Sequence, residues 1–486
     1  MYRPRRIGLI LATPGKRLAF PKLWRWSMLS ETEENLNTLM LLTGMSEDDA
    51  TTLLRHRVRV TSSDAGDFPH LAGDIRRLLE RTLTVVGECD PCDLELGVGK
   101  TPYEGDALCL SLSDTAMTVR PREDGILVST RDHIAGITRK ACACFAAGFV
   151  LSRLVGASLP NPPGRTFELK FANIGLPVDE ITKALDLKDA VLAGGGGVAN
   201  GFLWALEELN PHGQLTIVDP KRVRRGNANR CLYFDTEDAG YKADLLAERV
   251  NVPNVKLIPF RGTLSEYVRS RPDKRLPLLI STADSRIVRR TFQNELPYTV
   301  FDASTTDVSE LIVHSHEQPT ENACLSCIYP HIEDEDHRDK HVAETLGLTL
   351  EEIQERYISQ ATAEKLANTF PQLHKDELVG MAYDSLHKSL CGTQALIAPG
   401  AVQAAAPFSF VSNLAGVLLA LEMYRYQTDR ENWRRSNYMF LSPWMPPHSQ
   451  LRRLRPRRPR CEFCSVPTSL QALKGVWADK DWTTQS

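Results

Sequence analysis

The chain has 486 residues, a length that accommodates two or three domains. Hydrophobic residues make up 42% and charged residues 24% of the chain, a composition that excludes collagen-like, coiled-coil and wholly disordered proteins. The 58 basic and 61 acidic residues give a net charge of -3, which argues against a general nucleic-acid-binding protein.

The first 165 residues are expected to form an α/β domain. A capping box of Ser30 and Glu33 begins a helix that Gly44 ends. Short strands are predicted at 82–86, 108–112, 117–120 and 126–129, followed by an alanine-rich helix at 134–155. The segment 158–165, SLPNPPGR, cannot continue a helix, and we interpret it as a domain boundary.

From residue 189 to about residue 330, apolar strands alternate with helical segments. Strands are predicted at 190–193, 215–218, 255–259, 278–281 and 299–302, and helices at 201–209 and 241–250. This alternation is typical of a mainly parallel, Rossmann-like sheet with crossover helices, which we assign to residues 166–330. Residues 331–400 are expected to be a helical insertion. Residues 401–486, beginning with an apolar helix at 408–424, are expected to return to the sheet domain.

The N-terminus has a six-residue apolar stretch, which is short for a signal peptide, so we expect a cytoplasmic protein. The longer apolar segment at 401–423 is interrupted by Pro407 and Glu422. It is therefore predicted to be a buried core helix, and no membrane is expected as a partner.

A glycine-rich loop follows the predicted strand at 190–193. The run from Gly194 through Gly196 and Gly197 to Ala199 has the pattern G-x-G-x-x-A, in which backbone N–H groups and a helix N-terminus can bind phosphate. Asp219 ends the next strand, where a carboxylate can accept hydrogen bonds from ribose hydroxyls. The order of strand, loop, helix and acid predicts a nucleotide site. A glycine loop in an unrelated α/β domain is the alternative.

Charged side chains further along the chain indicate which nucleotide is bound. Arg230 and Lys242 can offset charge that develops on phosphates, and Asp284, after the strand at 278–281, can hold Mg²⁺. Hydride transfer needs no such set, whereas attack on the α-phosphate of ATP does. We therefore expect ATP and Mg²⁺, although each of these side chains taken alone could be a solvated charge.

The stretch from Asp219 to Arg230 resembles the D-x-D-x-V-x-x-S-N-L-x-R signature of the ThiF, MoeB and ubiquitin-activating-enzyme superfamily. The resemblance implies an adenylation domain in which Asp219 binds ribose, Asn227, Arg230 and Lys242 contact the triphosphate, and Asp284 binds magnesium. This sequence departs from the family pattern at Ala199, Lys221, Gly226 and Cys231.

The eleven cysteines are interpreted as metal ligands or catalytic groups, because disulfides are rare in reducing compartments. Cys324-Leu-Ser-Cys327 and Cys461-Glu-Phe-Cys464 can each present two thiolates to a tetrahedral Zn²⁺. Their spacing leaves open whether they share one ion or act in redox chemistry, and the resemblance implies one shared zinc. Cys89-Asp-Pro-Cys92 is a third pair without a predicted partner.

Cys391 lies between the two predicted zinc-binding pairs, close in sequence to His387 and Lys388, which could lower the pKa of its thiol. The resemblance implies that Cys391 is the nucleophile that forms a thioester. A buried structural cysteine is the alternative reading of Cys391, and Cys231 is the second candidate nucleophile.

The resemblance implies ATP-dependent activation of a ubiquitin-like protein. The substrate would be adenylated at its C-terminus, joined to Cys391 as a thioester and transferred to a conjugating enzyme, as in the compact enzymes of bacterial antiviral (Bil-type) conjugation operons. The ubiquitin-like protein and the conjugating enzyme are the expected partners, a homodimer is compatible with the resemblance, and no nucleic acid is expected.

Residues 1–165 are expected to be an inactive adenylation domain, with the helix at 141–155 in the place of the helix at 408–424. Three alternatives to the activating enzyme remain. They are a sulfur-carrier or peptide adenylating enzyme without a thioester relay, an NAD-dependent oxidoreductase, and a non-catalytic scaffold.

Overall fold

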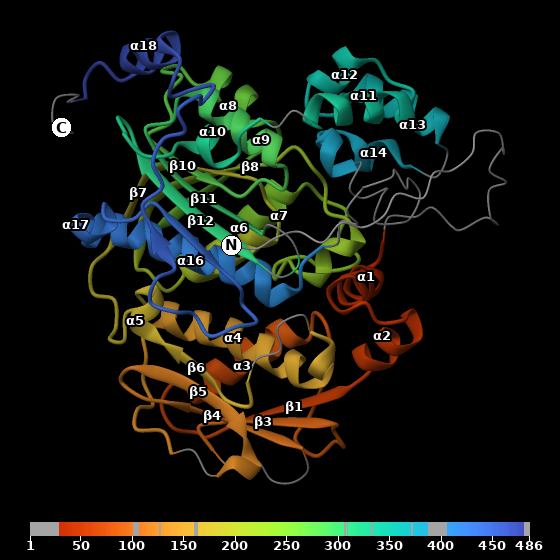
Figure 1. Ribbon diagram of the computed structural model, residues 1–486, viewed down its shortest axis with the longest axis vertical. Coiled ribbons are helices and arrows are strands. Elements are labelled where there is room, and N and C mark those ends of the chain that lie inside the picture. Colours follow the sequence, from red (N-terminus) through yellow and green to blue (C-terminus); the bar gives the residue numbers. More distant parts are fainter. Residues whose placement is uncertain are drawn as a thin grey trace.

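The structure, a computed structural model, describes residues 29–100, 106–125, 128–159, 164–305, 308, 310–331, 334–370, 373–386 and 406–480. Two α/β halves are joined through helices that lie between their sheets (Figure 1). The first sheet has six strands in the order β2-β1-β3-β4-β5-β6, and the second has eight in the order β14-β13-β12-β11-β10-β7-β8-β9. The predicted α/β class with a mainly parallel second sheet is confirmed.

The first half contains both elements that were predicted and elements that were not. Its strands are β1 (Arg57–Ser62), β2 (Thr84–Val86), β3 (Leu94–Val98), β4 (Ala107–Leu112), β5 (Ala116–Pro121) and β6 (Phe167–Lys170), and its helices are α1 (Glu31–Thr43), α2 (Glu47–Leu54), α3 (Phe68–Leu79) and α4 (Gly136–Val155). β1 and β3 were not predicted. The strand expected at 126–129 is wrong at its described residues, Val128 and Ser129, which lie in a loop.

The expected boundary at residue 165 does not coincide with the end of the first sheet. β6 lies beyond it and pairs with β5, and the short helix α5 (Phe171–Ile174) follows. The proline-rich segment is therefore part of the connection from α4 to β6. Prolines mark a break in regular structure, but such a break can lie within a domain as well as between domains.

The second half is built around β7, which carries the glycine loop at its carboxyl end. Its strands are β7 (Leu185–Ala193), β8 (Pro211–Val218), β9 (Val255–Phe260), β10 (Leu278–Ser281), β11 (Thr299–Thr305), β12 (Leu311–Glu317), β13 (Tyr438–Leu441) and β14 (Arg452–Arg453). The helical elements are α6 (Gly197–Leu206), η3 (Arg225–Asn229), α7 (Lys242–Arg249), α8 (Leu264–Ser270), α9 (Arg286–Phe292), α10 (Leu325–Ile328), α16 (Ser409–Thr428), α17 (Arg430–Trp433) and α18 (Pro467–Val476).

The two halves share one connectivity. In each, a run of parallel strands is followed by antiparallel ones, and a 20-residue helix connects the first antiparallel strand to the second, α4 between β5 and β6 and α16 between β12 and β13. The spatial order β2-β1-β3-β4-β5-β6 thus matches β8-β7-β10-β11-β12-β13. The outer strands β9 and β14 have no counterpart in the first half.

Helices α4, α6 and α16 pack closely between the two sheets. A Cβ atom built on Gly201 of α6 would lie 2.4 Å from the Asn413 carbonyl oxygen of α16, and one built on Gly416 would lie 2.2 Å from the Phe202 nitrogen. Side chains at these two positions would push the helices apart. The largest cluster of buried apolar residues runs through both halves, so they share one core.

The predicted insertion is helical in its described part. It contains α11 (Asp334–Leu346), α12 (Leu350–Gln354), α13 (Gln360–Thr369) and α14 (Lys375–Leu378), packed around a small core of their own beside the second half (Figure 1). Among the described residues, one helical segment, Gly136–Ser158, is long and apolar enough to cross a bilayer, and 72% of its most apolar window is buried inside the protein.

Candidate functional site

The glycine loop connects the end of β7 to the start of α6. Gly194 has φ of +105°, and a Cβ atom there would lie 2.9 Å from the Ala283 nitrogen, so both its conformation and its surroundings require glycine. Gly196 is the N-cap residue of α6, and it has no side chain to accept a hydrogen bond from the first turn. A Cβ atom built on it would meet no described atom within 4 Å. The first turn of α6 therefore has backbone N–H groups and adjacent space for an anion.

Asp219, at the end of β8, is buried beside this loop. One carboxylate oxygen, Oδ2, accepts a 2.6 Å hydrogen bond from the Gly195 N–H, and Oδ1 accepts a 2.7 Å bond from the Lys221 N–H. These bonds fix the carboxylate at the carboxyl end of the sheet. Each oxygen keeps a second lone pair that can accept a hydrogen bond from a ligand hydroxyl.

Lys242 begins α7 and is also buried. A Cβ atom on Gly195 would lie 3.1 Å from the Lys242 Cβ, so this lysine is adjacent to the loop. Burial lowers the pKa of Lys242 to about 8; Asp219 opposes the shift, and Lys221 and Arg224 add to it. Desolvation and neighbouring cations destabilise the charged form of this ammonium group, and a bound anion would stabilise it.

Asp284 follows β10 and forms an ion pair that the sequence did not reveal. The Lys221 Nζ lies 2.8 Å from Asp284 Oδ2, and the side chains are 12% and 52% exposed. Burial opposes the charge on Lys221, but Asp284 and Asp219 outweigh it and raise the pKa of this lysine. Lys221 was noted only as a departure from the family pattern, and its pairing with Asp284 depends on the meeting of two loops.

Arg230 and Asn227 lie in and directly after η3. A Cβ on Gly197 would lie 3.2 Å from the Arg230 Cγ, so the arginine is beside the loop, and its Nη1 donates to Asn229 Oδ1 at 2.7 Å. Asn227 Oδ1 accepts from the Arg224 N–H at 3.1 Å and stabilises the turn. In this structure Asn227 shapes the η3 segment, and its expected contact with a triphosphate stays a prediction.

Two further residues of this region were missed from the sequence. Burial lowers the pKa of Arg224, which interacts electrostatically with Asp284, so Arg224 is a second cationic side chain, besides Lys221, that acts on the same acid. Asn35 of α1 accepts a 3.2 Å hydrogen bond from Asn229, so a helix of the first half stabilises the position of η3. Arg224 occupies an unspecified position of the Asp219–Arg230 signature, and Asn35 lies outside it, where only the packing of α1 against η3 brings Asn35 to the site.

The helical insertion contacts both loops that carry an acid. A Cβ on Gly380 would lie 2.5 Å from the Cβ of Pro220, the residue after Asp219, and Ser285, the residue after Asp284, donates a 2.7 Å hydrogen bond to Asp384. Cys391 belongs to the predicted insertion of residues 331–400 but lies outside the described residues, as do His387 and Lys388.

Cys231 does not fit the role of a second nucleophile. Its side chain is fully buried, and burial raises the pKa of its thiol. Because the thiolate is the reactive form, this cysteine behaves as a core residue. Its position beside Arg230 in the sequence suggested otherwise, but the side chain belongs to the hydrophobic core.

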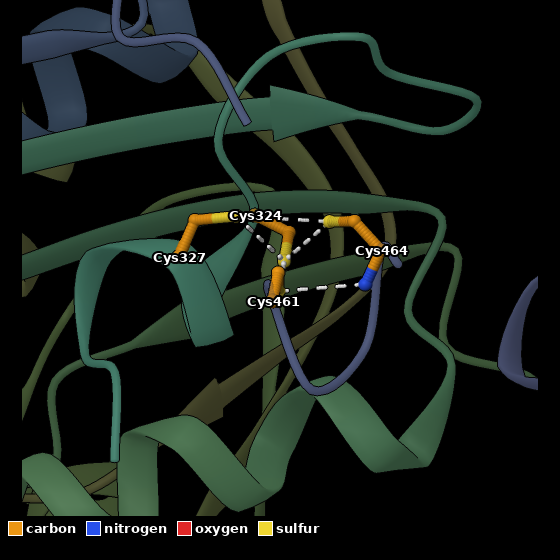
Figure 2. A group of neighbouring side chains, drawn as sticks. All are labelled: Cys324, Cys327, Cys461 and Cys464. Carbon is orange, nitrogen blue, oxygen red and sulfur yellow. Dashed lines mark hydrogen bonds between the residues drawn. The ribbon is translucent and has the colours of Figure 1, made fainter. Parts of the chain in front are cut away.

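The four cysteines of the two predicted pairs form one cluster (Figure 2). The Sγ atom of Cys324 lies 3.8 Å from the Sγ atoms of Cys327 and Cys461 and 3.0 Å from that of Cys464. All four sulfur atoms lie within 4.8 Å of one another. Four sulfurs at 2.3 Å from a tetrahedral zinc would be about 3.8 Å apart. The cluster therefore fits one structural zinc ion, whereas Cys89 and Cys92 belong to no such group among the described residues.

The comparisons with known proteins found weak similarities. No family model matches the chain. A curated relative, the uncharacterized protein y4jF of Sinorhizobium fredii (strain NBRC 101917 / NGR234), is 26% identical over 317 residues, covering 59% of this chain and 59% of that protein. The chain thus matches little more than half the length of this relative.

Two solved structures also resemble the chain. Escherichia coli MccB, crystallised with AMPCPP and MccA, has a TM-score of 0.34 and 14% identity over 57% of this chain and 66% of that chain. PaaA has a TM-score of 0.31 and 13% identity over 55% of this chain and 71% of that chain. Similarities this weak do not assign a function, so any assignment depends on the residues of the site.

Proposed function

We propose that the chain is an ATP-dependent adenylating enzyme that activates a carboxylate. The observation that supports this most is the convergence of Asp219, Lys221, Lys242 and Asp284 beside the first turn of α6. This arrangement provides N–H donors and cations for phosphates and a buried acid for ribose hydroxyls. An NAD-dependent oxidoreductase needs a pyrophosphate-binding loop and an acid, but it does not need so many cations.

In the proposed reaction, a substrate carboxylate oxygen attacks the α-phosphorus of ATP. The bond between the α-phosphorus and the bridging oxygen breaks, and the products are an acyl-adenylate and pyrophosphate. Lys242 and Arg230 would stabilise the negative charge that moves onto the leaving pyrophosphate. Preorganised cations at such a position commonly contribute about 3 kcal/mol each to the lowering of the barrier.

The finer proposal is that the substrate is the C-terminus of a ubiquitin-like protein and that Cys391 receives the acyl group as a thioester. Its support comes from the sequence pattern around Asp219 and from the position of Cys391 within an insertion whose described part contacts both acid-bearing loops. A conjugating enzyme would then accept the acyl group. A peptide or sulfur-carrier adenylating enzyme would use the same nucleotide site without Cys391.

The four-cysteine cluster would hold a zinc ion with a structural role. Four thiolates complete a tetrahedral site and leave no position for a substrate, so the ion would connect α10 to the segment that carries Cys461 and Cys464. Magnesium fits less well at Asp284, because Oδ2 of this residue already accepts from the Lys221 ammonium. No step of the proposed reaction is assigned to that metal.

Nucleotide binding and pyrophosphate exchange test the proposal in two stages. Wild-type protein should bind ATP with one site per chain, and Lys242→Met should weaken binding about tenfold or more through loss of one charge-assisted contact. Lys365→Met, which removes an ammonium from an ion pair with Glu352 on the insertion, should leave binding unchanged. Failure of wild-type protein to bind ATP would refute the proposal.

Exchange of labelled pyrophosphate into ATP, measured with a panel of ubiquitin-like proteins and peptides, then identifies the carboxylate substrate. Cys391→Ala separates the two forms of the proposal. Retained exchange with loss of a thioester that is sensitive to reducing agent would support the relay, whereas retained formation of the final product would refute it.

A further inference from the structure

Lys221 departs from the signature that the sequence resembles and lies at the site. The superfamily signature that the sequence resembles has an aspartate at this position, and the change to lysine reverses its charge. The Lys221 side chain points toward the second acid of the site, with Nζ 2.8 Å from Asp284 Oδ2. Its backbone is fixed on both sides, because its N–H donates to Asp219 and its carbonyl accepts from the Lys242 N–H at 3.0 Å.

The charge balance of the site differs from that of a site with an aspartate at position 221. The inner set consists of two carboxylates, Asp219 and Asp284, and four cations, Lys221, Arg224, Arg230 and Lys242. Glu34 of α1, and Glu377 and Asp384 of the insertion, contribute negative charge from neighbouring elements, so the cations are in excess only in the inner set. Within that set the Lys221 ammonium lies 2.8 Å from Asp284 and neutralises its charge, which weakens the attraction of this carboxylate for a divalent cation that arrives alone.

The Lys221 ammonium group has donors for a phosphate even while it stays paired with Asp284. An ammonium group has three donors, and Asp284 Oδ2 accepts one of them. The Lys221 backbone bonds to Asp219 on one side and to the start of α7 on the other, so its side chain begins at the same edge of the sheet as the glycine loop. The ion pair with Asp284 holds the ammonium group at this edge.

We propose that Lys221 is a phosphate-binding residue. Its ammonium group neutralises Asp284, as a divalent cation would otherwise do, so this chain binds nucleoside triphosphates without metal. This proposal rests on the proposed nucleotide site. It concerns binding alone, and it makes no statement about the metal requirement of the later chemical step.

The first experiment measures the dissociation constant for ATP by calorimetry, in excess EDTA and in excess Mg²⁺, for wild-type protein and for Lys221→Met. The wild-type values should agree within about threefold. Lys221→Met should bind about tenfold or more weakly in EDTA, as expected for loss of a contact to a charged group, and should recover most of that loss in Mg²⁺. Lys365→Met is the matched control, with no change in either buffer.

The second experiment uses Mn²⁺ as a spectroscopic probe on the protein without nucleotide. Wild-type protein should bind no Mn²⁺ at this site by electron paramagnetic resonance, whereas Lys221→Asp, which places a third carboxylate beside Asp219 and Asp284, should bind one ion per chain. This readout is independent of activity, and its wild-type arm does not depend on the folding of any variant.

A wild-type protein that binds ATP only with Mg²⁺, or that binds Mn²⁺ at Asp284 without nucleotide, would overturn the proposal. An unchanged affinity of Lys221→Met in EDTA would do the same. If wild-type protein binds ATP in neither buffer, the proposed nucleotide site itself is wrong, and that result is distinguishable from failure of the role of Lys221 alone.

Discussion

The two halves of the molecule use the same strand order and an equivalent long helix, but they differ at the first turn of the helix that follows β1 in the first half and β7 in the second. In the second half, Gly196 begins α6 with space around it. In the first half, a Cβ on Gly66 would lie 2.3 Å from the Asp132 carbonyl oxygen, and one on Gly99 would lie 2.5 Å from the Phe68 ring. The corresponding space is therefore filled by the protein itself.

Charge reinforces this difference. Asp67 is the N-cap residue of α3, and its Oδ2 accepts a 3.0 Å hydrogen bond from the Ile134 N–H. A carboxylate at a helix N-terminus satisfies the helix dipole and repels phosphate. We propose that the first half is an inactive adenylation domain that supports the second, and the comparison shows that a shared topology does not guarantee a shared site.

The four-cysteine cluster has no counterpart in the first half among the described residues, and loss of the proposed zinc ion should produce the largest effect. Cys461→Ser should lower the free energy of unfolding by on the order of 4 kcal/mol, because it removes a ligand from a closed structural site. Differential scanning calorimetry with zinc analysis checks this. Cys89→Ser is the control, and an equal loss in both variants would contradict a structural metal.

The open helix start of the second half can be given an N-cap carboxylate like that of the first. Gly196 has φ of -86° and ψ of -163°, an extended conformation that aspartate adopts readily. Gly196→Asp should weaken ATP binding about a hundredfold while the melting temperature is retained or rises, since the carboxylate competes with phosphate for the same N–H groups.

The uncharged variant Gly196→Asn is its control. It offers a similar cap without the charge, so its loss of affinity should be about tenfold smaller. Equal losses for Asp and Asn would mean that shape rather than charge determines binding. Unchanged ATP affinity in both variants would show that the phosphates do not bind at the start of α6.

The pKa of Lys242, lowered by burial to about 8, predicts a pH dependence. As pH rises through 8 the ammonium loses its proton, so ATP affinity should fall about tenfold between pH 7.5 and 9.5, and binding above pH 8 should take up a proton. Titration calorimetry in buffers of different ionisation enthalpy measures the uptake. Lys242→Arg should abolish both effects, and their persistence in this variant would assign them to another group.

The same shift has an opposite consequence for stability without ligand. The folded pKa of Lys242 lies below the usual value of 10.5, so burial of the charged form costs stability in full below pH 8. This cost decreases as pH rises from about 8 to 10.5. Lys242→Met should therefore increase the melting temperature of the ligand-free protein at pH 7 while it weakens nucleotide binding.

The smallest expected effect lies in the first half. Asp67→Ala should reduce the free energy of unfolding by about 1 kcal/mol through loss of its hydrogen bond to the Ile134 N–H, and should leave ATP affinity within about twofold of wild type. A second molecule of ATP bound by this variant would show that the first half retains a usable site.

The sequence predicted the second half better than the first for physical reasons. The glycine loop followed by Asp219 and Lys242, and each C-x-x-C pair, are local patterns whose spacing is typical of a ligand site. By contrast, β1 and β3 were not predicted, although their residues build the first sheet. The proline-rich segment at 158–165 breaks a helix but does not end a domain, because β6 pairs with β5 beyond it.

The contacts that refine the site were beyond prediction because they join distant loops. Lys221 meets Asp284 across 63 positions, Asn229 meets Asn35 across 194, and the burial of Cys231 depends on packing in the core. The three-dimensional arrangement brings Lys221, a departure from the motif, into an ion pair with Asp284. It also removed Cys231 from the candidate nucleophiles.

A crystal structure of the full chain with a non-hydrolysable ATP analogue tests the central claim most directly. The account predicts one nucleotide per chain, with phosphate oxygens on the N–H groups between Gly194 and Gly197 and within hydrogen-bond distance of Lys242 Nζ, and with the first half unoccupied. A nucleotide bound in the first half, or phosphates placed away from these lysine and glycine residues, would contradict it.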